Sequence, residues 1–135
     1  MRQFTVEEAT ALLPRVRRLA EKMVELRARL RALQHEAEAR RRAAGSNGGG
    51  RLPAGSEQQV GVGDTTLAEL RKTLGAIEEL GVLVKDVDVG LLDFPARHPV
   101  TGENVLLCWK VGETEIGYWH GEAEGFAGRK SLPLS

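Results

Sequence analysis

The sequence predicts an α+β fold, in which two helices precede a small antiparallel sheet. Apolar residues recur every three or four positions up to residue 44 and again over 64–80, which is typical of helices. Over residues 82–120, β-branched and aromatic residues alternate with polar ones, which is typical of strands. A chain of 135 residues is the size of one domain, so we expect a single domain spanning residues 1–135.

The first predicted helix spans residues 1–44. Thr5 and Glu8 have the spacing of a capping box, which marks a helix start. Pro14 lies inside the helix and should kink it, because proline lacks an N–H group and its ring clashes with a preceding carbonyl. Beyond Pro14 the gaps between apolar residues alternate between three and four, as in a coiled-coil seam. The seam consists of Val16, Leu19, Met23, Leu26, Leu30, Leu33 and Ala37.

Residues 45–63 contain the run GSNGGG and are predicted to be a flexible loop. The second predicted helix spans residues 64–80, with Asp64 as its N-cap and Gly81 as its stop. At about 1.5 Å per residue, residues 15–44 reach roughly 20 Å farther than this helix. The unmatched length indicates a coiled-coil-like hairpin that pairs with a second copy, so we expect a homodimer.

Four strands are predicted at residues 82–89, 91–97, 104–111 and 114–120, followed by a tail at 121–135. Pairing Arg97 with Asn104 places Asp93 opposite Cys108 on the neighbouring strand.

A tight turn at Gly112 and Glu113 would place Trp109 opposite Ile116 on the last strand. Tyr118, with His120 at the edge, would then join the apolar face that packs on the helices. Trp119 would lie on the other face. A slip of one residue would exchange the two faces of the strand.

Charge and composition exclude several classes of protein. The chain has 19 basic and 19 acidic residues, so no net charge drives it toward nucleic acid or membranes. Residues 1–44 carry 11 basic and 6 acidic residues, and the remainder carries 8 and 13. The basic run at residues 40–42 lacks interleaved aromatic residues, so nucleic-acid binding is not expected. One cysteine and the lack of an apolar leader or long apolar run favour a soluble, cytoplasmic protein.

The second face of the predicted sheet mixes apolar side chains with charged ones, which is typical of ligand pockets and of subunit interfaces. The candidate ligand-binding residues are Asp93, Arg97, Trp119, His120 and Arg129. Residues 125–129 fit either an anion-binding loop or a tail that pairs Arg129 with Asp93 or a nearby carboxylate.

No metal site or cofactor is expected from the spacing of the ligand-type residues. Asp86, Asp88 and His120 come nearest to a metal-ligand pattern, but the paired local elements of structural zinc sites are missing. Cys108 lies among apolar residues, which favours a buried, unreactive thiol.

Several short segments carry a family resemblance: FTVEEA, LLP, VKD, DFPAR, CW, IGYWH and GFAGR. Together they resemble the bacterial family catalogued as domain of unknown function 2203. The resemblance implies a small cytosolic bacterial protein of mixed helix and sheet, and it implies no activity. Its motif positions are Asp86, Asp93, Arg97, Trp109, Tyr118, Trp119, His120 and Arg129.

Two functions are open at this point. The first is a non-enzymatic interaction or structural protein that acts as a homodimer. The alternative is a small-ligand or anion site, with catalytic or metal-dependent chemistry, in the C-terminal sheet. The alternative needs Asp93, Arg97, His120 and Arg129 to converge in space.

Overall fold

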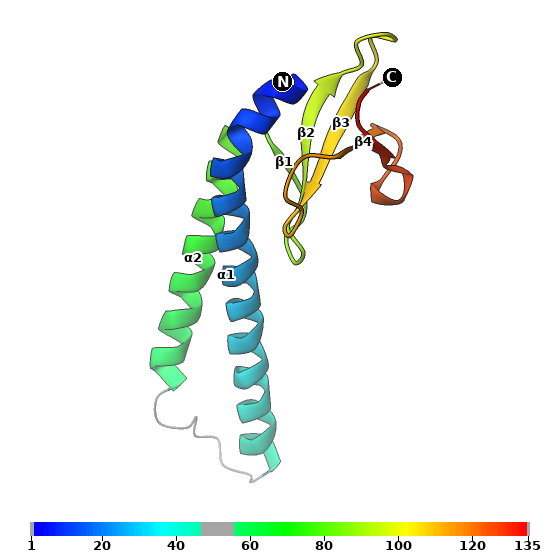
Figure 1. Ribbon diagram of the computed structural model, residues 1–135. Helices are drawn as coiled ribbons and strands as arrows, with labels where there is room; N and C mark the ends of the chain where they lie inside the picture. Colours follow the sequence, from blue (N-terminus) through cyan, green and yellow to red (C-terminus); the bar gives the residue numbers. More distant parts are fainter. Residues whose placement is uncertain (1, 47–55, 135) are drawn as a thin grey trace.

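The computed structural model describes residues 2–46 and 56–134 and has the predicted α+β architecture. A two-helix stalk carries a sheet at one end, and the first turns of the first helix lie beside that sheet (Figure 1). The helices are α1 (Val6–Ser46) and α2 (Ser56–Glu79), and a short 3-10 helix, η1, spans Phe126–Gly128. The strands are β1 (Leu83–Asp86), β2 (Leu91–Arg97), β3 (Asn104–Lys110), β4 (Tyr118–Gly121) and β5 (Lys130–Ser131).

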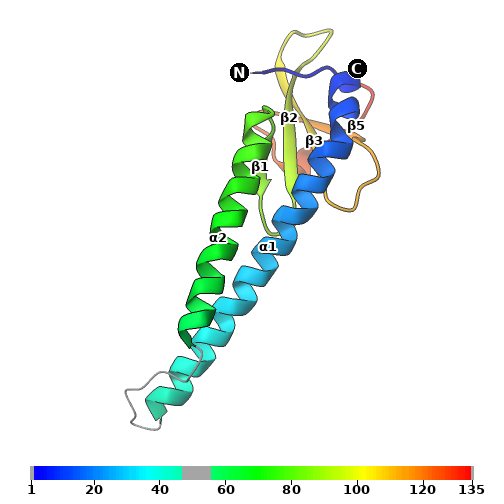
Figure 2. The ribbon, with the colours of Figure 1, turned by 90° about the vertical axis from the view of Figure 1, so that its left-hand side faces the viewer.

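Helix α1 begins with the expected capping box. The Glu8 N–H donates to Thr5 Oγ1 at 3.0 Å, and the Thr5 N–H donates to Glu8 Oε1 at 3.1 Å. These hydrogen bonds, the one from the Thr5 N–H foremost, lower the pKa of the Glu8 carboxyl. The helix runs on through Pro14, and Figures 1 and 2 show its first turns inclined to the rest, as expected near a proline.

The predicted seam joins the two helices, which lie side by side in both views of the ribbon. Its buried members on α1 are Val16, Met23, Leu26 and Leu30, and those on α2 are Leu70 and Ile77. Beyond Leu33, which is partly buried, Ala37 is exposed. The seam therefore ends before α1 does.

Helix α2 begins at Ser56, eight residues before the expected start at Asp64. Of the loop predicted at 45–63, residues 47–55 lie outside the described residues. Thr65 and Thr66 lie inside the helix, where their hydroxyls donate hydrogen bonds to the carbonyls of Gly61 and Val62, four residues earlier. Glycines in this stretch disfavour a helix, but propensity is a weak guide once a helix packs against a neighbour. The helix stops as expected at Gly81, whose φ is +89°.

The five strands form one antiparallel sheet in the order β1-β2-β3-β4-β5. The predicted register between β2 and β3 is confirmed, with Asp93 opposite Cys108 and Arg97 opposite Asn104. Pro95 lies beyond Leu83, where β1 begins, and its carbonyl accepts a hydrogen bond from the Phe4 N–H at 2.7 Å. The N-terminal segment therefore covers the exposed edge of β2 and ties the start of α1 to the sheet.

The predicted register between β3 and β4 is wrong by one residue. Cys108 pairs with Tyr118 and Leu106 with His120, across a loop longer than a two-residue turn. Hydrogen bonds to Glu113 hold this loop, because its carbonyl accepts from the Trp109 indole at 3.0 Å and its carboxylate accepts from the Lys110 N–H at 2.8 Å. Compared with the predicted register, the observed one places Tyr118 and His120 on the second face of the sheet and Trp119 on the helix-facing face.

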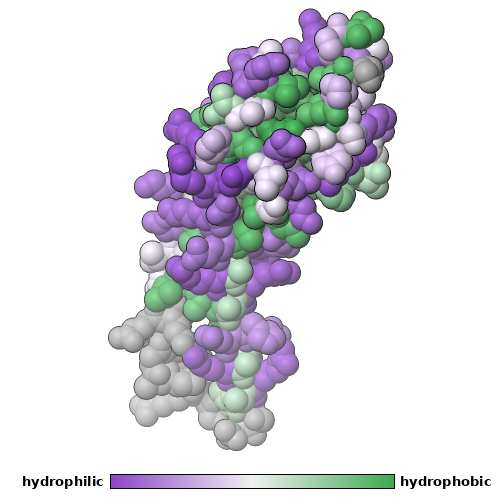
Figure 3. All heavy atoms as spheres, in the orientation of Figure 1, coloured by the Kyte–Doolittle hydropathy of each residue, from purple (hydrophilic) through white to green (hydrophobic). Residues whose placement is uncertain are grey.

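The two faces of the sheet differ in character. The helix-facing face packs into the main core with α1 and α2, and its residues are Leu92, Phe94, Ala96, Val105, Leu107 and Trp109. The second face carries Asp93, Pro95, Leu106, Cys108, Tyr118 and His120. Figure 3 shows apolar side chains gathered over the sheet end of the molecule and hydrophilic ones along the stalk. The exposed apolar surface therefore gathers at the sheet end of the molecule.

Candidate metal centre

Three side chains from three adjacent strands converge on the second face. Asp93 comes from β2, Cys108 from β3 and His120 from β4, and one ligand-type atom of each lies within 4.8 Å of the other two. Their relative exposures are 1 %, 0 % and 4 %, so all three are buried. The cross-strand pairing of Asp93 with Cys108 brings the first two together, and His120 reaches across β3 to join them.

The hydrogen bonds of His120 define its ring chemistry. Its Nδ1 lies 2.9 Å from the Gly121 carbonyl oxygen, which can only accept, so Nδ1 carries a hydrogen. Its Nε2 lies 3.2 Å from Asp93 Oδ1 inside the cluster. Metal-binding histidines commonly donate their non-ligating ring N–H to a group such as a backbone carbonyl, as Nδ1 does here.

Burial shapes the electrostatics of the two acidic groups. It raises the pKa of the Asp93 carboxyl, against the opposing influence of His120 and Lys85. Burial, together with the negative charge of Asp93, raises the pKa of the Cys108 thiol to about 11. Without a metal the thiol therefore stays protonated at neutral pH, as expected for an unreactive buried cysteine.

Arg129 borders the cluster on the side of β4. Its guanidinium carbon lies 3.8 Å from the centre of the Tyr118 ring and 4.2 Å from that of the Phe126 ring. Its Nη1 is 3.0 Å from Glu113 Oε2, which makes an ion pair without good hydrogen-bond geometry. The carboxylate that pairs with Arg129 is thus Glu113, and the guanidinium opposes the rise in the pKa of the Cys108 thiol.

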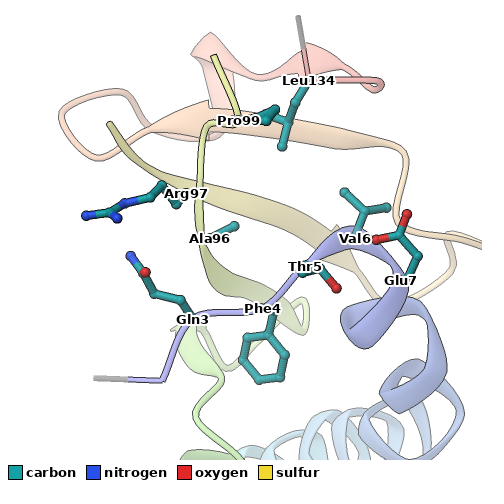
Figure 4. Close-up of a pocket in the computed structure, with 9 residues that line it drawn as sticks. All are labelled: Gln3, Phe4, Thr5, Val6, Glu7, Ala96, Arg97, Pro99 and Leu134. Carbon is teal, nitrogen blue, oxygen red and sulfur yellow. The ribbon is translucent and has the colours of Figure 1, made fainter. Parts of the chain in front are cut away.

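Arg97 and Trp119, two other candidates from the sequence, do not join the cluster. Arg97 lies four residues along β2 from Asp93, a separation of about 13 Å. It lines a different cavity together with Gln3 and Glu7, which Figure 4 shows with their side chains. Trp119 contacts His98, with 5.5 Å between the ring centres. The proposed convergence of four residues therefore reduces to Asp93 and His120, with Arg129 beside them.

The acidic pair Asp86 and Asp88 has a separate role in the turn between β1 and β2. The Asp88 N–H donates to Asp86 Oδ1 at 2.9 Å. The Asp88 carboxylate accepts from Arg27 Nε at 3.0 Å, which ties the turn to α1. Neither residue belongs to the cluster that contains His120.

The cluster was not recognisable from the sequence, because the expected register placed Asp93 opposite Cys108 but put His120 on the edge of the other face. Gly112 permits a two-residue turn, and the same residues also fit a longer loop. The one usable signal was the sensitivity of strand faces to a one-residue slip.

The cluster fits the ligands and size of a zinc-type site. Carboxylate oxygen, thiolate sulfur and imidazole nitrogen are the donors that zinc uses in proteins, at about 2.0–2.3 Å. In a tetrahedral site these bond lengths place an oxygen and a nitrogen about 3.3 Å apart. The separation of 3.2 Å between Asp93 Oδ1 and His120 Nε2 is close to that value, and it is also the length of a direct hydrogen bond between them. Three protein ligands leave a fourth position for another group.

The fold and the site define a small α+β protein with a buried Asp–Cys–His cluster on its sheet. The family model described as uncharacterized conserved protein (DUF2203) matches residues 2–132, and the chain belongs to this family. No curated protein matches the chain, and no solved structure does. Over the described residues, neither helix has both the length and the apolar character needed to cross a membrane.

Proposed function

We propose that this protein binds one divalent transition-metal ion, of the zinc type, through Asp93, Cys108 and His120. The observation that carries the proposal is the convergence of oxygen, sulfur and nitrogen donors within 4.8 Å. The hydrogen bond from His120 Nδ1 to the Gly121 carbonyl supports it, because the bond directs Nε2 into the cluster.

Charge balance favours a metal over a purely structural buried pair. A buried ion pair often stabilises a protein no better than apolar residues of similar size. A divalent cation bound to the carboxylate of Asp93, the thiolate of Cys108 and neutral His120 forms a group with no net charge. Such a group avoids the large cost of burying an unbalanced charge. The positive ion also favours the deprotonated thiolate, as metals do with coordinating thiols.

Titration of metal-free protein with Co²⁺ and Zn²⁺ tests the proposal. We expect one ion per chain and a thiolate-to-cobalt charge-transfer band in the near ultraviolet. Asp93→Asn, Cys108→Ser and His120→Gln should each weaken binding by more than ~100-fold, because losing only an outer hydrogen-bond partner costs ~10–100-fold.

Two matched variants control for nonspecific effects. Asp88→Asn removes a carboxylate from the β1–β2 turn, and His35→Gln removes an exposed imidazole from α1. Both should bind Co²⁺ as the unmodified protein does. The metal proposal fails if no charge-transfer band forms, or if the control variants lose as much affinity as the cluster variants.

Homodimerisation is our second proposal. The observation that favours it is that α1 has 41 residues and α2 has 24, so α1 is longer than its partner helix in the hairpin. The exposure of Ala37 shows where the intramolecular seam stops. Light scattering during size exclusion, at several protein concentrations, should give twice the monomer mass. A monomer at all concentrations would refute this proposal.

We also propose that the protein works in the cytoplasm. Cys108, which is free and buried, fits a reducing compartment, where thiols persist. Fractionation of cells that express the tagged chain would test the location.

A further inference from the structure

Arg129 carries a buried hydrogen-bond donor that the fold leaves unused. Its Nη1 is buried and makes no hydrogen bond to any described residue, although it lies 3.0 Å from Glu113 Oε2. A buried donor without an acceptor costs free energy, because it has given up its hydrogen bonds to water. In a native structure such an atom calls for an explanation, and a missing bound ion is one of the common ones.

Two aromatic rings hold the guanidinium in place. The Arg129 Cζ atom lies 3.8 Å from the centre of the Tyr118 ring and 4.2 Å from that of the Phe126 ring. Tyr118 belongs to β4 and Phe126 to η1, so contacts from two elements restrict the side chain. A planar guanidinium is well suited to such stacking. Only 20 % of the Arg129 side chain is exposed.

The guanidinium meets the cluster at Cys108. Tyr118, on which Arg129 stacks, is the cross-strand partner of Cys108, so both side chains stand on the second face. Burial raises the pKa of the Cys108 thiol, whereas hydrogen bonding to Arg129 and the charge of Arg129 oppose that rise. Burial lowers the pKa of Arg129, but contact with Cys108 and Glu113 raises it overall. A neutral thiol is a weak acceptor, which leaves Nη1 without a hydrogen bond.

Metal binding at the cluster would supply a better acceptor. A metal ion deprotonates a coordinating thiol, and hydrogen bonds to an ionised acceptor are stronger than those to a neutral one. Glu113 already balances the charge of Arg129. The guanidinium can therefore donate to a thiolate at Cys108 without adding net charge to the site.

We propose that Arg129 is a positioning residue of the metal site and donates a guanidinium N–H to the metal-bound thiolate of Cys108. The proposal rests on the metal site proposed above. Outer hydrogen-bond partners of this kind orient the ligands of a metal ion and tune its properties. Arg129 would act on the ion through Cys108, without touching the ion.

The test compares the Co²⁺-loaded full-length protein with its Arg129→Met variant, which lacks the N–H groups and the charge. A hydrogen bond withdraws electron density from the thiolate sulfur, so its loss should move the thiolate-to-cobalt charge-transfer band to longer wavelength. We expect this shift together with a Co²⁺ affinity that is weaker by ~10–100-fold, as is typical when an outer partner is lost. Circular dichroism checks that the variant is folded.

Arg97→Met is the matched control, because Arg97 is an exposed arginine of the same sheet and does not join the cluster. Its charge-transfer band and its Co²⁺ affinity should equal those of the unmodified protein. If Arg129→Met does not fold, Arg129→Lys takes its place. Lysine keeps the charge but lacks the planar fork, so the band should shift in the same direction by a smaller amount.

The position of the band separates the proposed role from a merely structural one. A residue needed only for packing would change stability but not the energy of the sulfur electrons. If the folded variant binds Co²⁺ with the band in its original position, the role of Arg129 is overturned and the metal site stands. An equal shift in Arg97→Met overturns it as well. If Co²⁺ does not bind the unmodified protein, both proposals fall.

Discussion

The two faces of the sheet are almost equally buried, yet their chemistry is opposite. On the helix-facing face, Phe94 and Leu107 are 0 % exposed and entirely apolar. On the second face, Asp93, Cys108 and His120 are at most 4 % exposed and carry ionisable groups. Burial alone therefore does not separate core from site. Ionisable side chains are seldom fully buried without a partner, which is why we propose the functional site on the second face.

Truncating a ring on the helix-facing face should have the largest effect on stability. Phe94→Ala removes a fully buried ring that meets Phe4 edge to face at 5.4 Å, so we expect a loss of about 3–5 kcal/mol in the free energy of unfolding. Urea denaturation measures it. Val100→Ala, at a side chain that is 80 % exposed, is the control and should stay within about 0.5 kcal/mol. A loss below about 1 kcal/mol for Phe94→Ala would show that this face is not the core.

Breaking the buried Asp93–His120 pair on the second face should lower the free energy of unfolding nearly as much. In metal-free protein, His120→Leu leaves Asp93 buried without its partner, and we expect a loss of about 3 kcal/mol. The double variant Asp93→Leu/His120→Leu should recover to within about 1 kcal/mol of the unmodified protein, yet bind no Co²⁺. Urea denaturation and cobalt titration of the same samples give both values. A double variant as unstable as the single one would mean that the pair is needed for folding.

Adjacent leucines on β3 compare the two faces with the same chemical change. Leu107 points into the main core and is 0 % exposed, whereas Leu106 lies on the second face, in a groove that Leu83 and Pro95 also line, and is 7 % exposed. Leu→Ala costs about 2–5 kcal/mol, depending on how fully the site collapses. We expect Leu107→Ala near the upper end and Leu106→Ala near the lower, a difference of about 2 kcal/mol by urea denaturation. Equal losses would remove the energetic distinction between the faces.

The smallest effect is expected at the rim of the second face. Arg129→Lys keeps the charge but weakens the stacking of the planar guanidinium on Tyr118 and Phe126. Its ion pair with Glu113 is about 20 % exposed at both side chains and is partly screened. We expect a loss below about 1 kcal/mol in the free energy of unfolding, measured by thermal denaturation. A loss of several kcal/mol would place Arg129 in the core instead.

Much of the scaffold was predictable from local pattern. The apolar seam from Val16 to Leu30 predicted that the two helices pair, because positions three and four residues apart lie on one face of a helix. The register of β2 on β3 followed from the short connection after Arg97, which leaves few ways to pair Asp93. The start of α2 was not predictable, since Gly61 and Gly63 disfavour a helix by propensity and yet lie within it.

The candidate site was only half predictable. Asp93 and Cys108 could be placed opposite each other from the sequence, but His120 could not be added to them. The register of β4 depends on a loop held by contacts of its own, among them the hydrogen bond from the Trp109 indole to the Glu113 carbonyl. The short strand β5, which pairs with β4, has no sequence signal of its own either.

By itself, the sequence determined the α+β class, the helical seam and the pairing of β2 with β3, because each follows from residue spacing over a short stretch of chain. Tertiary structure alone decided which face His120 occupies. Side chains alternate along a strand, so a shift of one residue moves every side chain to the other face. That single shift, set by how the loop after Lys110 packs, brought a nitrogen donor to the oxygen of Asp93 and the sulfur of Cys108.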